Sequence, residues 1–224
     1  MYKSSQGAHR GYCGRLVGVV MSVAILGGCP DPEGKLDAFL EETRDVRDLP
    51  PPKEDLGSMI EDVSGTFLMV VASSIAKDKP LQFLATQTFT PTPDGGLLDL
   101  TLQPLSLDSS STTSPRLPVG DPIALEGIKV DAEGRYAVPE AEDEFITVMV
   151  TGMANPITGS DIVTELRYAG FIQSADFICG NITGAVLVPL DYDLMGSTFA
   201  AIRVEDTSPA SLPVPFVDFE PSCE

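Results

Sequence analysis

The chain of 224 residues carries 33 acidic against 14 basic residues, a net charge of −19 at pH 7, and a surface this acidic repels anionic headgroups and excludes a nucleic-acid partner. Its single histidine, His9, lies among the first 28 residues, and the chain contains no tryptophan. Since the rest of the chain lacks the commonest general base and transition-metal ligand, we expect no catalytic residues, no metal site, no cofactor and no enzymatic activity.

The first 28 residues have the pattern of an export signal. Three basic residues, Lys3, Arg10 and Arg15, precede an apolar run over residues 16–26. This run is too short for a membrane-spanning helix, which needs about 20 apolar residues. A basic start, a short apolar core and small residues at its end are typical of a signal peptide. We expect residues 1–28 to be removed, which leaves about 11 basic residues against 33 acidic ones.

The segment ends in Leu26, Gly27, Gly28 and Cys29. An aliphatic residue, two small residues and a cysteine in this order resemble the lipobox of bacterial lipoproteins. The resemblance implies that Cys29 receives a diacylglyceryl thioether, that the chain is cut before it, and that the new amino terminus is acylated. At least two acyl chains give stable anchoring. The implied location is the cell envelope, with the outer membrane favoured over the inner one; an uncleaved anchor helix and an ordinary secretory peptide are the alternatives.

Two of the four cysteines remain free after this processing. Cys13 leaves with the signal and Cys29 is lipidated, so Cys179 and Cys223 are left. An exported chain meets an oxidising compartment, which favours an intramolecular disulfide between them. Such a bond would stabilise the fold by about 4 kcal/mol, because it closes a long loop in the unfolded chain. A reactive thiol is the alternative.

Residues 29–54 form a polar segment that we expect to act as a tether after the lipidated cysteine. Leu36, Phe39 and Leu40 are spaced i, i+3 and i+4, which allows a short amphipathic helix. Three prolines at 50–52 would end the helix and stiffen the chain that follows. A helix that packs on the following domain is the alternative.

Residues 55–207 are expected to form an antiparallel β domain. Apolar runs predict short strands around 63–72, 81–89, 98–102, 123–130, 136–138, 146–150, 162–173, 182–188 and 198–204. Residues 106–122 are rich in Ser, Thr and Pro and predict a long loop. Around Gly127 the apolar residues change from odd-numbered to even-numbered positions, which predicts a β-bulge. Eight or nine strands without helices between them predict an all-β, up-and-down meander that closes as a barrel, with a β-sandwich as the alternative. Residues 208–224 form a Pro-rich tail.

The first strand opens with Ser64, Gly65, Thr66 and Phe67. This start resembles that of lipocalin-type barrels, which normally have tryptophan where Phe67 stands. The resemblance implies an eight-stranded cup for an apolar ligand. Small inward residues such as Gly170, Gly184 and Ala201 would leave room for it.

Two acidic segments were candidates for cation binding. The segment 191–196 begins like a calcium loop, but Met195 stands where a third oxygen ligand belongs and Ile202 where the closing glutamate belongs. The acidic run 140–144 is typical of charges that keep a neighbouring strand from pairing with other chains. We therefore predict no metal site in either segment.

These observations favour one function and leave two alternatives. The favoured function is a membrane-anchored, non-enzymatic structural or interaction module of the cell envelope, attached through acyl chains on Cys29. The first alternative is a lipocalin-like carrier of a small apolar ligand. The second is a hydrolase that works with carboxylates alone, which would need two acidic residues buried in one pocket. The expected partners are the membrane and either an apolar ligand or another envelope protein.

Overall fold

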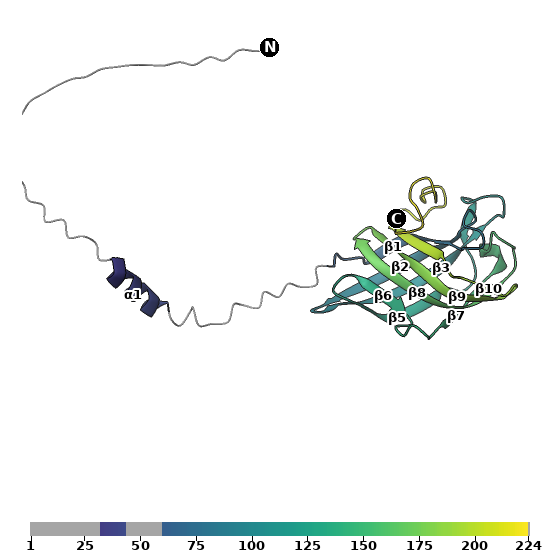
Figure 1. Cartoon of the computed structure of the whole chain (residues 1–224). Coiled ribbons are helices and arrows are strands. Elements are labelled where there is room, and N and C mark those ends of the chain that lie inside the picture. The colour runs from purple at the N-terminus through teal and green to yellow at the C-terminus, as the bar shows by residue number, and fades with distance from the viewer. Residues whose placement is uncertain (1–31, 44–59, 224) are drawn as a thin grey trace, which may run out of the picture. The chain divides into compact units, whose positions relative to one another are not determined.

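The computed structural model describes residues 32–43 and 60–223 of the chain (Figure 1). The predicted signal peptide at 1–28, the predicted lipidation site Cys29 and most of the predicted tether lie outside these residues. The chain divides into two units, residues 1–53 and residues 54–224.

The described part of the first unit is the helix α1 (Pro32–Glu42). Leu36, Phe39 and Leu40 lie on one side of it by their spacing, and all three are exposed. The backbone N–H and the hydroxyl of Thr43 both donate to the carbonyl of Phe39, which satisfies a carbonyl at the helix end. No helix among the described residues is long and apolar enough to cross a membrane.

The second unit is built from strands (Figure 1). They are β1 (Gly65–Ala72), β2 (Leu81–Thr92), β3 (Gly95–Leu107), β4 (Pro115–Pro118), β5 (Ile123–Val130), β6 (Arg135–Val138), β7 (Ile146–Val150), β8 (Ile162–Ser174), β9 (Phe177–Val188), β10 (Tyr192–Asp193) and β11 (Ser197–Arg203). A short 3-10 helix, η1 (Gly152–Ala154), follows β7.

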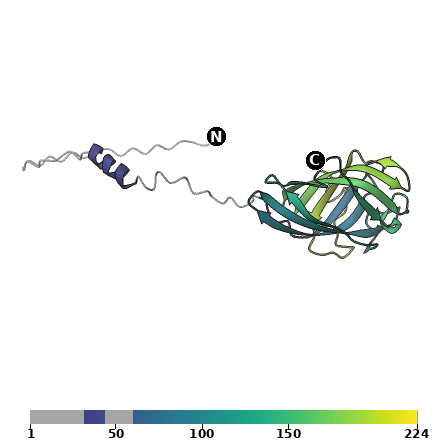
Figure 2. The same cartoon turned by 90° about the horizontal axis from the view of Figure 1, so that it is seen from below.

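Eight of these strands close an antiparallel barrel, which confirms the predicted fold class. The order around the barrel is β1-β2-β3-β5-β6-β8-β9-β11, and β11 pairs with β1 to close the circle. Apart from the extra strands between them, consecutive members of these eight strands are neighbours in the wall, as in an up-and-down meander. Figure 2 shows these strands wrapped around a common axis. The three extra strands, β4, β7 and β10, extend the wall at its margins.

One part of the wall consists of two short strands placed end to end. β6 pairs with residues 168–171 of β8, and β7 pairs with residues 162–166 of the same strand. Residues 139–145 leave the ladder between them. β5 joins this wall only at the pair Val130–Tyr136, and no pair links β5 to β7 among the described residues. The hydrogen-bonded wall is therefore interrupted between β5 and β7.

Two local predictions have different outcomes. The loop predicted over residues 106–122 is wrong in part, because Leu105 and Leu107 of β3 pair with Pro118 and Pro115 of β4. The bulge at Gly127 is confirmed: between two aligned pairs, β5 has two residues opposite one residue of β3, and Gly127 has a φ of 66°. Glycine readily adopts a positive φ, and the extra residue in β5 explains why its apolar residues change from odd-numbered to even-numbered positions here.

The barrel interior holds the main core. Inward residues of β1, β2 and β3 alternate with outward ones, and Phe67, Phe83, Leu98 and Phe199 are among the buried members. This burial follows from the period-two apolar patterns of these strands.

A second core lies outside the barrel, beneath the C-terminal tail. Leu68 and Val70 face outward from β1 and pack with Leu105 of β3 and Leu212 of the tail. The buried guanidinium of Arg116 donates to the carbonyls of Leu212 and Pro213, at 2.9 and 2.8 Å. The tail is thus a packed cover, and it explains why β1 is apolar on both faces.

Candidate functional site

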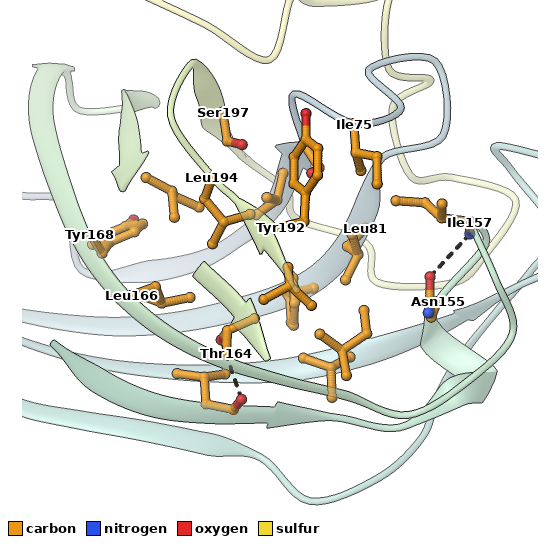
Figure 3. Close-up of a pocket in the computed structure, with 18 of the residues that line it drawn as sticks. Ile75, Leu81, Asn155, Ile157, Thr164, Leu166, Tyr168, Tyr192, Leu194 and Ser197 are labelled. Atoms are coloured by element: carbon orange, nitrogen blue, oxygen red, sulfur yellow. Dashed lines mark hydrogen bonds between the residues drawn. The ribbon is translucent and has the colours of Figure 1, made fainter. Parts of the chain in front are cut away.

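The barrel interior contains an apolar cavity of about 140 Å³ at the end where β1 finishes and β8 begins (Figure 3). Side chains from around the wall line it, including Met69, Val71, Phe83, Leu102, Leu125, Val148, Leu166 and Val186. The loop after β9 adds Leu190, Tyr192 and Leu194, and the loop before β8 adds Ile157. The space lies in the half of the barrel where the ladder between β5 and β7 is interrupted.

Among the residues that the structure describes, no charged side chain lines the cavity, although the chain as a whole is strongly acidic. Three buried polar side chains in its wall, those of Asn155, Thr164 and Ser197, form hydrogen bonds within the protein. The Asn155 amide nitrogen donates to Thr158 Oγ1 and to the carbonyl of Ser160, at 2.7 Å each. Thr164 Oγ1 donates to the carbonyl of Val148, and Ser197 Oγ accepts from the backbone of Ser74. The wall therefore favours an occupant without charge and with few polar atoms.

Tyr168 lines the cavity, and two further aromatic rings pack against its ring. Tyr168 stacks on Phe199 with ring centres 4.1 Å apart, and the Tyr136 ring lies 5.7 Å from that of Tyr168. The two tyrosine hydroxyls are hydrogen-bonded to each other at 3.2 Å. Burial raises the pKa of both tyrosines above the ordinary value of 10, and for Tyr168 the neighbouring Tyr136 adds to the rise. Both hydroxyls therefore stay protonated at neutral pH, and Tyr168 contributes its ring to the cavity wall.

The small residues expected to provide room do not line this cavity. A side chain at Gly170 would meet the ring of Tyr136, so the tyrosine already fills that space. A side chain at Gly184 would run into the backbone of β8, and Gly184 has a φ of 118°. Ala201 is buried in the main core. The prediction that these three positions leave room for a ligand is wrong, because none of them lines the cavity: the glycines are met by a tyrosine ring and by backbone, and Ala201 packs in the core.

The sequence predicts separate strands around 136–138 and 146–150, but it does not indicate that both pair end to end with the same strand, β8, beside the cavity. Pro139 and the acidic residues 140–144 end β6 and carry the chain out of the ladder before β7 begins. A proline followed by charges within an alternating apolar pattern is a signal for such an interruption.

The predicted disulfide is confirmed. Cys179 lies on β9, is fully buried and is bonded to Cys223 of the tail, with their Cα atoms 5.2 Å apart. Its neighbours Ile178 and Gly180 face the interior, so Cys179 faces outward. The bond therefore fixes the end of the tail to the outer surface of the barrel.

The acidic segments remain on the surface. Asp193 Oδ1 accepts a hydrogen bond from the backbone of Met195 at 2.8 Å, as in a simple turn. Glu140 forms an exposed ion pair with Lys129 at 3.0 Å. Among residues 60–223, no aspartate or glutamate is buried, and no group of three or more potential metal ligands gathers in the described part of the chain. The carboxylate pair that the hydrolase alternative requires is not found in the cavity wall.

In comparisons with protein-family models, with curated proteins and with solved structures, nothing matches this chain.

Proposed function

We propose that the protein is a lipid-anchored protein of the cell envelope whose barrel binds a small apolar molecule in the cavity. The observation that carries this proposal is the uncharged wall of the cavity in a chain of net charge −19. Ligand sites are typically concave and mostly apolar, with a few placed polar groups. An interaction module without a ligand ranks second, because it gives no reason for the side chains to leave this space unfilled.

The size of the cavity limits the ligand. A volume of about 140 Å³ is close to that of an engineered cavity of about 150 Å³ that binds benzene, and it is below the roughly 300 Å³ of drug-sized pockets. The best fit is one small ring or a short hydrocarbon segment. A larger molecule would bind with only part of its apolar portion inside and the remainder at the mouth.

The anchoring part of the proposal depends on the sequence pattern that ends at Cys29, which lies outside the described residues. The chain enters the barrel at Ser64, whose carbonyl accepts a hydrogen bond from Arg203 at 2.7 Å. This contact is at the end of β1 opposite the cavity.

Two measurements on the chain beginning at Pro30 test the binding function. Native mass spectrometry of the protein from its own host should show an extra mass that is lost on denaturation. Benzene should raise the midpoint of urea unfolding, because a ligand that binds only the folded state stabilises it. Val148→Phe, on the inward face of β7, should abolish this rise, whereas Thr147→Phe, the outward neighbour, should preserve it. A bare mass together with no effect of benzene would contradict the proposal.

A further inference from the structure

Exposed apolar side chains gather around the mouth of the cavity. Six of them lie on loops and strand ends there, and we call them the apolar rim: Ile75, Met149, Met153, Val188, Leu190 and Met195. Ile75 and Leu190 line the cavity and are also 43% and 62% exposed. An apolar surface therefore continues from the cavity wall to the outside of the molecule.

The strand register extends this surface down the outer wall. Met149 of β7 pairs with Val163 of β8, and Val163 pairs with Val188 of β9. The neighbours of Met149 and Val163 on their own strands line the cavity, so these two side chains face outward. Side chains at directly paired positions are within contact distance. Met149, Val163 and Val188 thus form a continuous apolar row beside the mouth.

The loops at the mouth are also connected to one another. The backbone of Ser74 donates to Ser197 Oγ at 3.0 Å, which places the residues before Ile75 against the turn that contains Met195. The backbone N–H of Gly152 donates to Asp161 at 2.7 Å, which holds the η1 segment that carries Met153. The apolar rim is therefore presented by tied loops rather than by separate free ends.

We propose that the apolar rim docks on the surface of a neutral lipid bilayer, so that the ligand moves between the lipid phase and the cavity without crossing water. This inference rests on the proposed binding function. A molecule that fits an uncharged apolar cavity concentrates in a bilayer, and contiguous exposed apolar surface marks an interaction site. Methionine side chains adapt to an irregular apolar phase.

The charges near the rim select the partner. Asp161, Asp191 and Asp193 are exposed in the same loops, so the mouth repels anionic headgroups but not zwitterionic ones. Two copies of the chain docked mouth to mouth would bring these aspartates together and would cover the opening. A neutral bilayer covers the apolar rim without bringing aspartates together and without closing the cavity to its ligand.

The test is sedimentation with phosphatidylcholine vesicles, using the chain from Pro30 so that no acyl chain is present. Every variant also carries Leu36→Ser, Phe39→Ser and Leu40→Ser, so that α1 contributes no apolar face. Met149→Glu with Leu190→Glu should lower the partition coefficient at least tenfold. Leu97→Glu with Val217→Glu is the matched control, because both positions are exposed and neither lines the cavity, and it should stay within twofold. Met149→Ser with Leu190→Ser should give an intermediate loss without added charge.

Ionic strength provides a second readout. Binding to phosphatidylcholine should not change between 0.05 and 0.5 M salt, whereas vesicles rich in phosphatidylglycerol should bind less at low salt and recover at high salt, since salt screens the repulsion. Equal partitioning of the rim variant and the parent chain would overturn the proposal. The proposal would also be overturned if the parent chain did not bind the vesicles. This includes the case in which the apolar rim forms a dimer contact in solution instead.

The two proposals fail separately. If benzene stabilises the chain but the apolar rim has no effect on vesicle binding, the cavity takes its ligand from water and only the docking proposal is wrong. If the rim variant loses vesicle binding but benzene has no effect, the docking surface remains and the cavity function is wrong.

Discussion

The guanidinium carbon of Arg203 lies 4.8 Å from the centre of the Phe67 ring, directly across the β1–β11 pair that closes the barrel. The same side chain donates to the carbonyls of Ser64 and Asp62, at 2.7 and 3.1 Å, and pairs with Asp176 at 2.7 Å. One arginine therefore connects the segment before the first strand, the last strand and the turn between β8 and β9. It closes the end of the barrel opposite the cavity.

Replacing Arg203 by alanine should destabilise the fold by about 2–3 kcal/mol, because several charge-assisted hydrogen bonds and a cation–π contact are lost together. The free energy of unfolding in urea is the measurement. Arg135→Ala, at an exposed position, should change it by less than about 0.5 kcal/mol. An equal effect of the two substitutions would show that Arg203 is not a closing residue.

Removing the disulfide with Cys179→Ala and Cys223→Ala should lower the free energy of unfolding by about 4 kcal/mol. The tail should also become sensitive to proteolysis after residue 208, since it covers Leu68 and Val70 and is fixed at its end by this bond. Reduced parent protein should behave like the double variant. Two titratable thiols in the native protein, without reductant, would contradict the bond.

The two buried tyrosines should make stability fall above pH 10. Burial raises the pKa of Tyr136 and Tyr168, so in this range the unfolded chain loses protons that the folded chain retains, and unfolding becomes easier. The expected slope is up to about 1.4 kcal/mol per pH unit for each tyrosine. Below pH 10 their contribution is constant.

The measurement is the urea midpoint at pH 8 and pH 11 for the parent chain and for Tyr136→Phe with Tyr168→Phe. Other groups ionise in the same range, so the difference between the two proteins is the relevant quantity. The variant should lose less stability on going to pH 11. Parallel pH profiles would mean that the tyrosines ionise equally in both states.

Cys29→Ala should leave an unprocessed and unlipidated precursor, because the modification requires the cysteine sulfur. Metabolic labelling with palmitate and the mass of the product measure this outcome. Cys13→Ala is the matched control and should be processed normally. Palmitate incorporation into the Cys29 variant at the parent level would exclude the lipoprotein assignment.

Most strands could be predicted because a strand depends on local pattern, whereas closure into a barrel was favoured over a sandwich only from the number of strands and the absence of helices between them. The sequence from Gly65 to Ala72 is apolar on both faces, which indicates burial on both sides, and the structure confirms it. What covers the outer face could not be predicted. Leu212, near the C-terminal end of the chain, packs with Leu68 of β1, and the apolar pattern within either segment does not indicate that contact.

The cavity required information that the sequence pattern lacks. Gly170 suggested open space, but its neighbour across the β6–β8 pair is Tyr136, and the ring lies over the glycine. Which residue faces a glycine depends on register, and register depends on the break between β6 and β7. The alternating pattern indicates which residues face inward, but it gives no distance between them and the opposite wall of the barrel.

The pairing of the first strand with the last determines when this protein can finish folding. β1 ends at Ala72 and its partner β11 begins only at Ser197, so the circle cannot close until nearly the whole chain is available. Contacts between such distant segments form slowly. If the chain is exported as proposed, this order of events would give it time to cross the membrane before it folds. A chain truncated before β11 would expose the free edges of β1 and β9 and would be prone to aggregate.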